Sequence, residues 1–156
     1  MRERTCCFTG HRKLPKEKIE QIVISLNREV ERLIGEGVTT FISGGALGFD
    51  QVAASLIVAK KHAGRDIRVV FALPGRNHDD RWSAEQKQLY RNLLAEADEI
   101  IYVSEKYANS GIKKRNRYMV DGSAYCICAR SYPVSGTDQM LKYARQKGLR
   151  IINVVE

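Results

Sequence analysis

A glycine-rich segment at residues 43–50, Ser-Gly-Gly-Ala-Leu-Gly-Phe-Asp, is the strongest candidate for chemistry in this sequence. Glycines let the backbone turn tightly and bring its amides against a phosphate, and a following helix adds partial positive charge. Asp50 is placed to bond ribose hydroxyls, as acidic residues do in dinucleotide folds. The segment matches neither the Gly-Lys-Ser/Thr phosphate loop nor the strict Gly-x-Gly-x-x-Gly spacing. A tight strand-to-helix connection, with Asp50 complementing the helix dipole, therefore explains it equally well. The candidate ligand-binding residues of this segment are Ser43, Gly44, Gly45, Gly48 and Asp50.

Two other parts of the chain carry polar residues suited to an anionic ligand. One is residues 9–12, which follow the first apolar run. His11 and Arg12 can contact an anion or a ribose there, or the segment is only a polar turn leading to Pro15. The other combines the basic run 113–117 with the start of the last expected helix, where an arginine can hold phosphate in a bidentate manner. Solvation explains most basic runs, so Lys113 and Lys114 are read as a solvated helix face. The candidate residues are Thr9, Gly10, His11, Arg12, Arg115, Asn116, Ser135, Gly136 and Thr137.

Two aromatic side chains, Trp82 and Tyr107, stand in polar surroundings between expected elements. Either can stack on a base. A half-buried aromatic beside a loop is the commoner explanation for such residues, and it is preferred here.

The elements that must position these residues alternate between strands and helices along the whole chain. Short apolar runs, typical of strands, occur at 5–8, 38–43, 67–73, 99–103, 124–129 and 150–155. Helical periodicity follows Pro15, the glycine segment and Ser83, whose Ser-Ala-Glu-Gln sequence has the form of a capping box. A short helix is expected around 113–119 and another over 137–146.

This alternation predicts parallel strands joined by right-handed crossovers, with helices on both faces of the sheet. The strands are continuously apolar, as expected when both faces are covered. We expect one three-layer α/β Rossmann-like domain over residues 1–156, with a mainly parallel sheet of about six strands. Ligands of such sheets bind at the carboxyl ends of the strands, where all three polar segments fall.

Composition excludes several protein classes. The 156 residues include 26 Lys+Arg and 18 Asp+Glu, giving a formal net charge of +8, and 44% are hydrophobic. These values are unlike those of disordered, collagen-like or disulfide-scaffold proteins. No apolar run approaches the roughly 18–20 residues that span a bilayer, and the N-terminus is too polar for a signal peptide. We therefore expect a cytoplasmic protein without membrane contact. The positive charge suits any anionic partner.

The four cysteines, Cys6, Cys7, Cys126 and Cys128, lie inside expected strands. Neighbouring strand residues point to opposite faces, so Cys6 and Cys7 cannot easily bind one ion. Buried core cysteines are the preferred interpretation, because free cysteine behaves as a small hydrophobe. We expect no metal, no disulfide and no cofactor.

Four segments together resemble the small bacterial YpsA-like proteins of the SLOG superfamily, whose Rossmann-like domains include STING-related and LONELY GUY-related members. The similarity covers nearly the whole chain and its order of motifs. It implies binding of a nucleotide or a derivative such as an ADP-ribose-like molecule, in bacterial signalling or stress responses. The segments are Thr5-Cys-Cys-Phe-Thr-Gly-His-Arg-Lys, Ser43-Gly-Gly-Ala-Leu-Gly-Phe-Asp, Lys114-Arg-Asn-Arg and Gly148-Leu-Arg-Ile-Ile-Asn.

The LONELY GUY branch consists of phosphoribohydrolases that use an arginine of Arg-x-x-x-Met and a glutamate of Pro-Gly-Gly-x-Gly-Thr-x-x-Glu. Arg115 and Met119 reproduce the first spacing, and residues 133–137 are a shortened form of the second. Met140 stands where the glutamate would be. A thioether can neither stabilise an oxocarbenium-like centre nor move a proton. The resemblance therefore favours a binding module, and no catalytic residue is assigned.

Two alternatives stay open. One is a divergent nucleoside-monophosphate N-glycosidase with Asp50 and Arg115 as catalytic candidates. The other is a DNA-binding module, because the superfamily includes the DNA-processing protein DprA. It ranks third, since the positive charge is spread along the chain and no aromatic array is evident. The expected partner is a phosphorylated nucleotide-type small molecule rather than nucleic acid, and a homo-oligomer is allowed.

Overall fold

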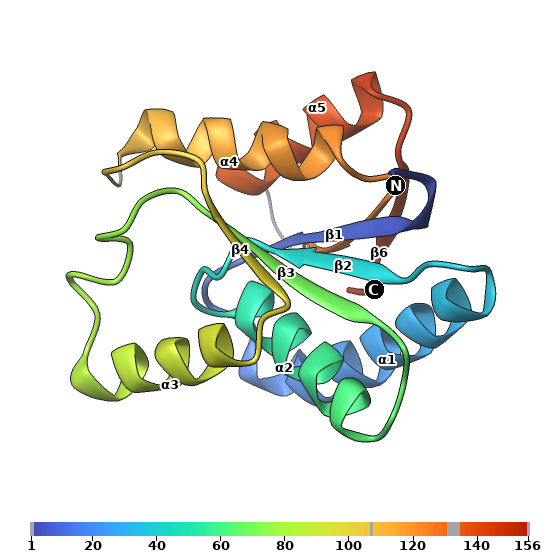
Figure 1. The fold of residues 1–156 in the computed structure, drawn as a ribbon. Helices are drawn as coiled ribbons and strands as arrows, with labels where there is room; N and C mark the ends of the chain where they lie inside the picture. The colour runs from blue at the N-terminus through green and yellow to red at the C-terminus, as the bar shows by residue number, and fades with distance from the viewer. Residues whose placement is uncertain (1, 107, 131–134, 156) are drawn as a thin grey trace.

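The computed structural model describes residues 2–106, 108–130 and 135–155 (Figure 1). Their strands form one sheet with the order β4-β3-β2-β1-β5-β6, and every neighbouring pair is parallel. The continuous apolar runs therefore become the central layer of the fold, as the sequence predicts. The strands are β1 (Thr5–Gly10), β2 (Thr40–Ser43), β3 (Arg68–Leu73), β4 (Glu99–Tyr102), β5 (Tyr125–Ala129) and β6 (Arg150–Asn153).

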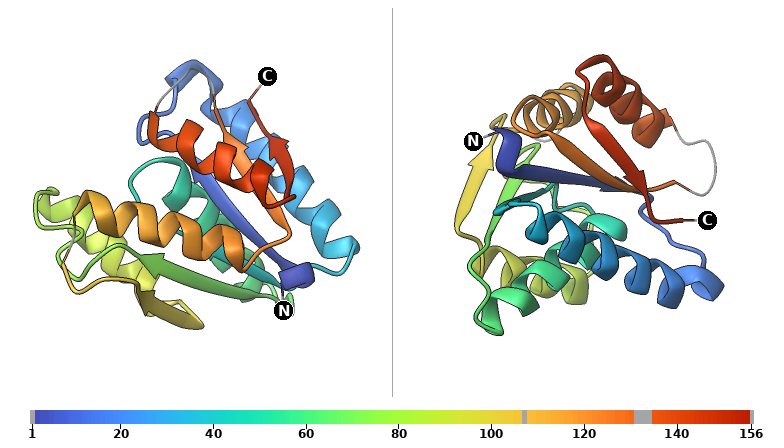
Figure 2. Two further views of the ribbon diagram at one scale, coloured as in Figure 1. Left: turned by 90° about the horizontal axis from the view of Figure 1, so that it is seen from above. Right: turned by 90° about the vertical axis from the view of Figure 1, so that its right-hand side faces the viewer.

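Helices cover both faces of this sheet, so the prediction of a three-layer Rossmann-like α/β fold is confirmed. Figures 1 and 2 show α1, α2 and α3 on one face and α4 and α5 on the other. The helices are α1 (Ile19–Gly35), α2 (Phe49–His62), α3 (Ala84–Ala95), α4 (Asn109–Asp121) and α5 (Ser135–Gln146), with short 3-10 turns at Arg2–Arg4 and Lys16–Lys18. Helix α4 is longer at both ends than the predicted 113–119.

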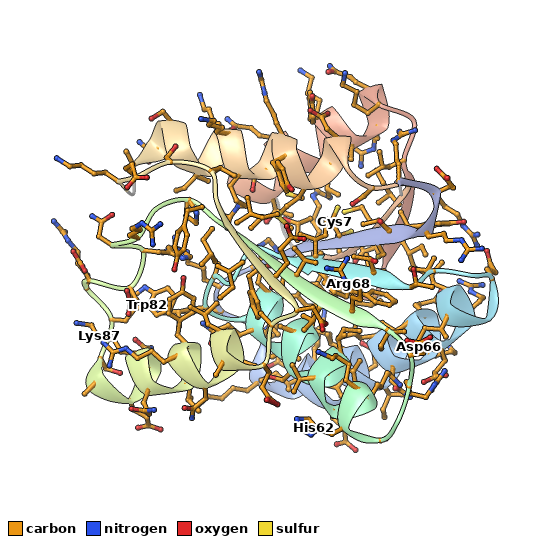
Figure 3. All side chains as sticks on the ribbon, viewed as in Figure 1. Cys7, His62, Asp66, Arg68, Trp82 and Lys87 are labelled. Carbon is orange, nitrogen blue, oxygen red and sulfur yellow. The ribbon has the colours of Figure 1, made fainter. Side chains whose placement is uncertain are left out.

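Two hydrophobic cores hold the layers together, one on each face of the sheet. On the α1–α3 face, Phe8 stacks on Phe41 with ring centroids 5.9 Å apart and meets Phe49 edge-on at 6.3 Å. On the α4–α5 face, Met119 and Leu141 pack against the strands. Cys6 belongs to the first core and Cys7, labelled in Figure 3, to the second, as the alternation of strand side chains requires. All four cysteines are buried.

The strand order fixes where a ligand can enter. From β1 the chain moves outward through β2 and β3 to β4, then crosses to β5 on the other side of β1. The segments after β1 and β5 therefore leave the sheet toward opposite faces, which opens a crevice at their carboxyl ends. No helix of the described residues is long and apolar enough to cross a membrane.

Candidate functional site

A pocket of about 430 Å³ lies in this crevice, at the carboxyl end of β1 between α2 and the α4–α5 layer. Eight of the residues singled out from the sequence line it, drawn from four separate parts of the chain. They are Thr9, Gly10, His11, Arg12, Asp50, Arg115, Asn116 and Thr137, and they share the lining with Phe8, Lys13, Ala46, Ile112, Met119 and Met140.

Arg115 brings a positive charge into the pocket from α4. It shares the inward face of the helix with Met119, four residues later, and only 7% of its surface is exposed. Its Nη1 donates to the carbonyl oxygen of Gly44 at 2.6 Å, and its Nε donates to Asn116 Oδ1 at 2.8 Å. These bonds fix the guanidinium group between α4 and the glycine segment.

Asp50 lies in the first turn of α2 and is buried. The backbone N–H of Ala46 donates to its carboxylate, whereas Oδ1 has no hydrogen-bond partner among the described residues. Burial raises the pKa of Asp50 to about 6, although the Arg115 and Arg12 charges and the Ala46 bond oppose this rise. A buried oxygen without a donor is costly, so a ligand hydroxyl would be a favourable partner.

Gly44 separates these two charged groups. A side-chain carbon at this position would lie 2.5 Å from Arg115 Nη1 and 2.9 Å from Asp50 Oδ2. Any larger residue would therefore displace the guanidinium or the carboxylate. The glycine is needed so that both groups can reach the same point of the backbone.

Ser43, Gly45 and Gly48 shape the loop and do not line the pocket, whereas Ala46 of the same segment does. Ser43 Oγ donates to the carbonyl of Asp50 at 2.9 Å and accepts from the Gly45 N–H at 3.2 Å. Gly45 backs onto Leu73, and Gly48, at φ +86°, packs against the carbonyl of Arg12. Gly44, Gly45 and Gly48 are not among the described residues that line this pocket, and their phosphate-cradling role stays a prediction.

Three backbone amides at or just before the start of α2 are engaged within the protein. The Gly45 N–H bonds Ser43, the Ala46 N–H bonds Asp50, and the Phe49 N–H donates to the carbonyl of His11 at 3.1 Å. The side chains of Arg115, Arg12 and Lys13 bring positive charge to the pocket.

Helix α5 supplies the opposite wall. Ser135 and Gly136 form its first turn, and Thr137 lines the pocket and is buried. Met140 follows one turn later and also lines the pocket, at the position where the LONELY GUY motif has glutamate. The remaining part of that motif, residues 133–134, lies outside the described residues, as does Tyr107.

A second pocket, of about 560 Å³, lies beside the first and is not predicted by the sequence. Arg12 lines both pockets. The other wall of the second pocket comes from the connection between β3 and α3. It includes His78, which is 4% exposed, and the half-buried Trp82. Burial, together with the Arg115 and Arg12 charges, lowers the pKa of His78 to about 3, so its ring is neutral at physiological pH. The only sequence signal was a lone tryptophan in a polar loop.

A model of the YpsA family, described as the YspA SLOG family, matches residues 6–153. The chain belongs to the YspA SLOG family. Among its relatives, the uncharacterized SPbeta prophage-derived protein YoqJ of Bacillus subtilis is 41% identical over 132 residues, covering 75% of this chain and 76% of that protein. The UPF0398 protein SERP1017 of Staphylococcus epidermidis is 25% identical over 101 residues, covering 64% of this chain and 54% of that protein. The chain thus spans only about half of the second relative.

Solved structures of two DNA processing proteins have the same fold as this YspA SLOG chain. DprA from Streptococcus pneumoniae superposes with a TM-score of 0.69 at 17% identity, covering 97% of this chain and 50% of that one. DNA processing protein A from Helicobacter pylori, solved to explain its binding of single-stranded DNA, gives 0.66 at 18% identity and covers 96% of this chain and 64% of that one. At these identities the likeness establishes the Rossmann-like fold alone.

Proposed function

We propose that this YspA SLOG chain binds a phosphorylated nucleotide-type ligand in the 430 Å³ pocket and does not cleave it. The observation that carries the proposal is the pairing of two buried groups around Gly44, the Arg115 guanidinium and the Asp50 carboxylate with its unpartnered Oδ1. A guanidinium binds phosphate, and a carboxylate oxygen accepts a hydrogen bond from a sugar hydroxyl.

The walls of the pocket suit the rest of such a ligand. Ile112, Met119 and Met140 supply an apolar surface for a sugar or base, while Arg12 and Lys13 add positive charge at the rim. Met140 cannot transfer a proton, which favours binding over hydrolysis. Among the described lining residues, Asp50 is the one carboxyl group, and its pKa near 6 would let it act as a general acid, which keeps the N-glycosidase alternative testable.

Single-stranded DNA is a second candidate ligand. The exposed face of α4 carries Lys113, Lys114 and Arg117 beside Tyr118, which is 42% exposed. Proteins bind single-stranded DNA with positive side chains that contact phosphates and with aromatic rings that stack on bases. The fold shared with a single-stranded-DNA-binding protein adds to the case. For Lys113 and Lys114 the sequence alone favours a solvated helix face instead.

The test is calorimetric titration with AMP, using two variants of the same helix. Arg115→Gln removes the buried guanidinium, and Arg117→Gln removes an exposed one outside this pocket. We expect AMP affinity to fall about 10- to 100-fold in the first variant and less than 2-fold in the second, because charge-assisted bonds contribute about 1.5–3 kcal/mol. Thermal unfolding of each unliganded variant shows whether it is folded.

Three results would overturn the proposal. One is AMP binding that responds equally to both substitutions. Another is release of free adenine from AMP by the wild-type protein and not by Asp50→Asn, which would establish the glycosidase. The third is the absence of AMP binding together with tight, steeply salt-dependent binding of an oligothymidylate that Arg117→Gln weakens, which would establish the DNA-binding alternative.

A further inference from the structure

The second pocket has the features of a stacking site for a planar ring. His78, Trp82 and Tyr90 form a cluster of edge-to-face contacts, with ring centroids separated by 5.1 Å for His78–Trp82, 5.8 Å for His78–Tyr90 and 4.9 Å for Trp82–Tyr90. His78 and Tyr90 are buried, whereas Trp82 is half-buried and lines the pocket. Two fixed rings therefore hold the indole in place, which lowers the entropy lost when a ligand stacks on it.

Side chains at the start of α3 add hydrogen-bonding capacity at the edge of such a ring. Gln86 lines the pocket and accepts from the Ser83 N–H through Oε1 at 3.0 Å. The Nε2 donors of Gln86 take no part in that bond. Leu47, from the loop before α2, provides an apolar contact on another wall. A nucleobase site combines aromatic rings for stacking, a polar group such as an amide for hydrogen bonding and apolar side chains for contact.

The two pockets share one positively charged side chain, that of Arg12. Arg12 lines both of them, and Ala46 of the first pocket precedes Leu47 of the second in the chain. Besides burial, the charges of Arg115 and Arg12, which both line the first pocket, lower the pKa of His78 in the aromatic cluster. A negative group placed between the pockets would therefore meet Arg12.

We infer that the second pocket is a base-stacking subsite, and that the ligand is a dinucleotide-type molecule whose two nucleosides occupy the two pockets and whose phosphate bridge lies at Arg12. This inference rests on the proposed function for the first pocket and adds to it the second nucleoside. Figure 3 shows Trp82 beside the connection that leads into α3, away from the α4–α5 layer that closes the first pocket.

The experiment compares two probes, AMP and diadenosine diphosphate, in which two adenosines are joined by a diphosphate bridge. Trp82 is the single tryptophan of the chain, so its fluorescence reports on this pocket alone. We expect diadenosine diphosphate to quench this emission and to bind at least about 10-fold more tightly than AMP. Trp82→Ala should weaken diadenosine diphosphate about 5- to 100-fold, the range for loss of one stacked base, and change AMP affinity less than 2-fold.

Two control variants sharpen the comparison. Trp82→Phe keeps an aromatic ring and should retain affinity for diadenosine diphosphate within about 3-fold. Tyr118→Ala removes an exposed ring outside both pockets and should leave this affinity unchanged. If Tyr118→Ala weakens binding as much as Trp82→Ala does, the stacking site is not specific to the second pocket and the inference is wrong.

The outcomes separate this inference from the proposed function. If Arg115→Gln weakens both probes while Trp82→Ala weakens neither, the first pocket binds nucleotides and the base-stacking subsite is refuted. If Trp82→Ala weakens AMP and diadenosine diphosphate equally, one nucleoside occupies the second pocket and the two-nucleoside ligand is refuted. If Arg115→Gln affects neither probe, the proposed function fails, whatever Trp82→Ala does. A linear dinucleotide, pApA, serves as a third probe, and its tighter binding would identify a nucleic acid end as the source of the two bases.

Discussion

Replacing Asp50 with asparagine should change the pH dependence of folding, because this carboxyl group is buried in the first turn of α2. Its pKa is about 6 in the folded protein and 3.8 in the reference state. Between these values the folded state binds more protons than the unfolded state, so the free energy of unfolding falls as the pH rises. The contribution of Asp50 protonation to the free energy of unfolding is fully present below pH 3.8 and is lost above about pH 6.

The size of this effect follows from the two pKa values. The difference between about 6 and 3.8 corresponds to about 3 kcal/mol, at 1.36 kcal/mol per pH unit. Of this free energy, about 2 kcal/mol is lost between pH 4.5 and pH 7.5, because part of it is already lost at pH 4.5. Arg12 and Arg115 remain charged throughout, and the titration of His78 is common to both proteins, so neither contributes to the difference.

The assay is urea unfolding of the wild-type protein and Asp50→Asn at pH 4.5 and pH 7.5. We expect the stability of Asp50→Asn, relative to wild type, to increase by about 2 kcal/mol from the lower to the higher pH. Asp66→Asn is the control, because Asp66 is an exposed carboxylate between α2 and β3 (Figure 3). A relative stability of Asp50→Asn that stays constant across this range would refute the reasoning that burial penalises the charged form.

Two further predictions concern the elements that frame the pockets. Gly48→Ala should lower the free energy of unfolding by at least about 2 kcal/mol, because φ is +86° and the new carbon would lie 2.2 Å from the Arg12 carbonyl oxygen. Gly64→Ala is its control: φ is +91° but nothing lies within 4 Å, so only about 1 kcal/mol should be lost, and equal losses would contradict the steric argument. Ser83→Ala removes the capping box of α3, in which the Gln86 N–H donates to Ser83 Oγ at 3.1 Å, and should cost about 1 kcal/mol in thermal or urea unfolding. An unchanged midpoint for Ser83→Ala would show that the helix start is held by other contacts.

Local sequence patterns determined the order and type of the elements. The apolar runs became the six parallel strands, and Ser83 with Gln86 forms the predicted capping box. These features depend on side-chain periodicity and on bonds between residues three or four positions apart, so a short window of sequence contains the information. The opposite burial of Cys6 and Cys7 follows from the same strand periodicity.

The tertiary structure decided which candidate residues meet and in what state. The bond from Arg115 to the Gly44 carbonyl joins residues 71 positions apart, and it exists because α4 packs over one face of the sheet (Figure 1) with Arg115 on its buried side. Gly45 packs against Leu73, and His78 is buried among aromatic rings, although Gly45 belongs to a glycine-rich segment and His78 to a polar one. Strand order and burial set these outcomes through long-range packing, which no local pattern encodes. The raised pKa of Asp50 has the same origin, because desolvation depends on what the fold places around the carboxyl group.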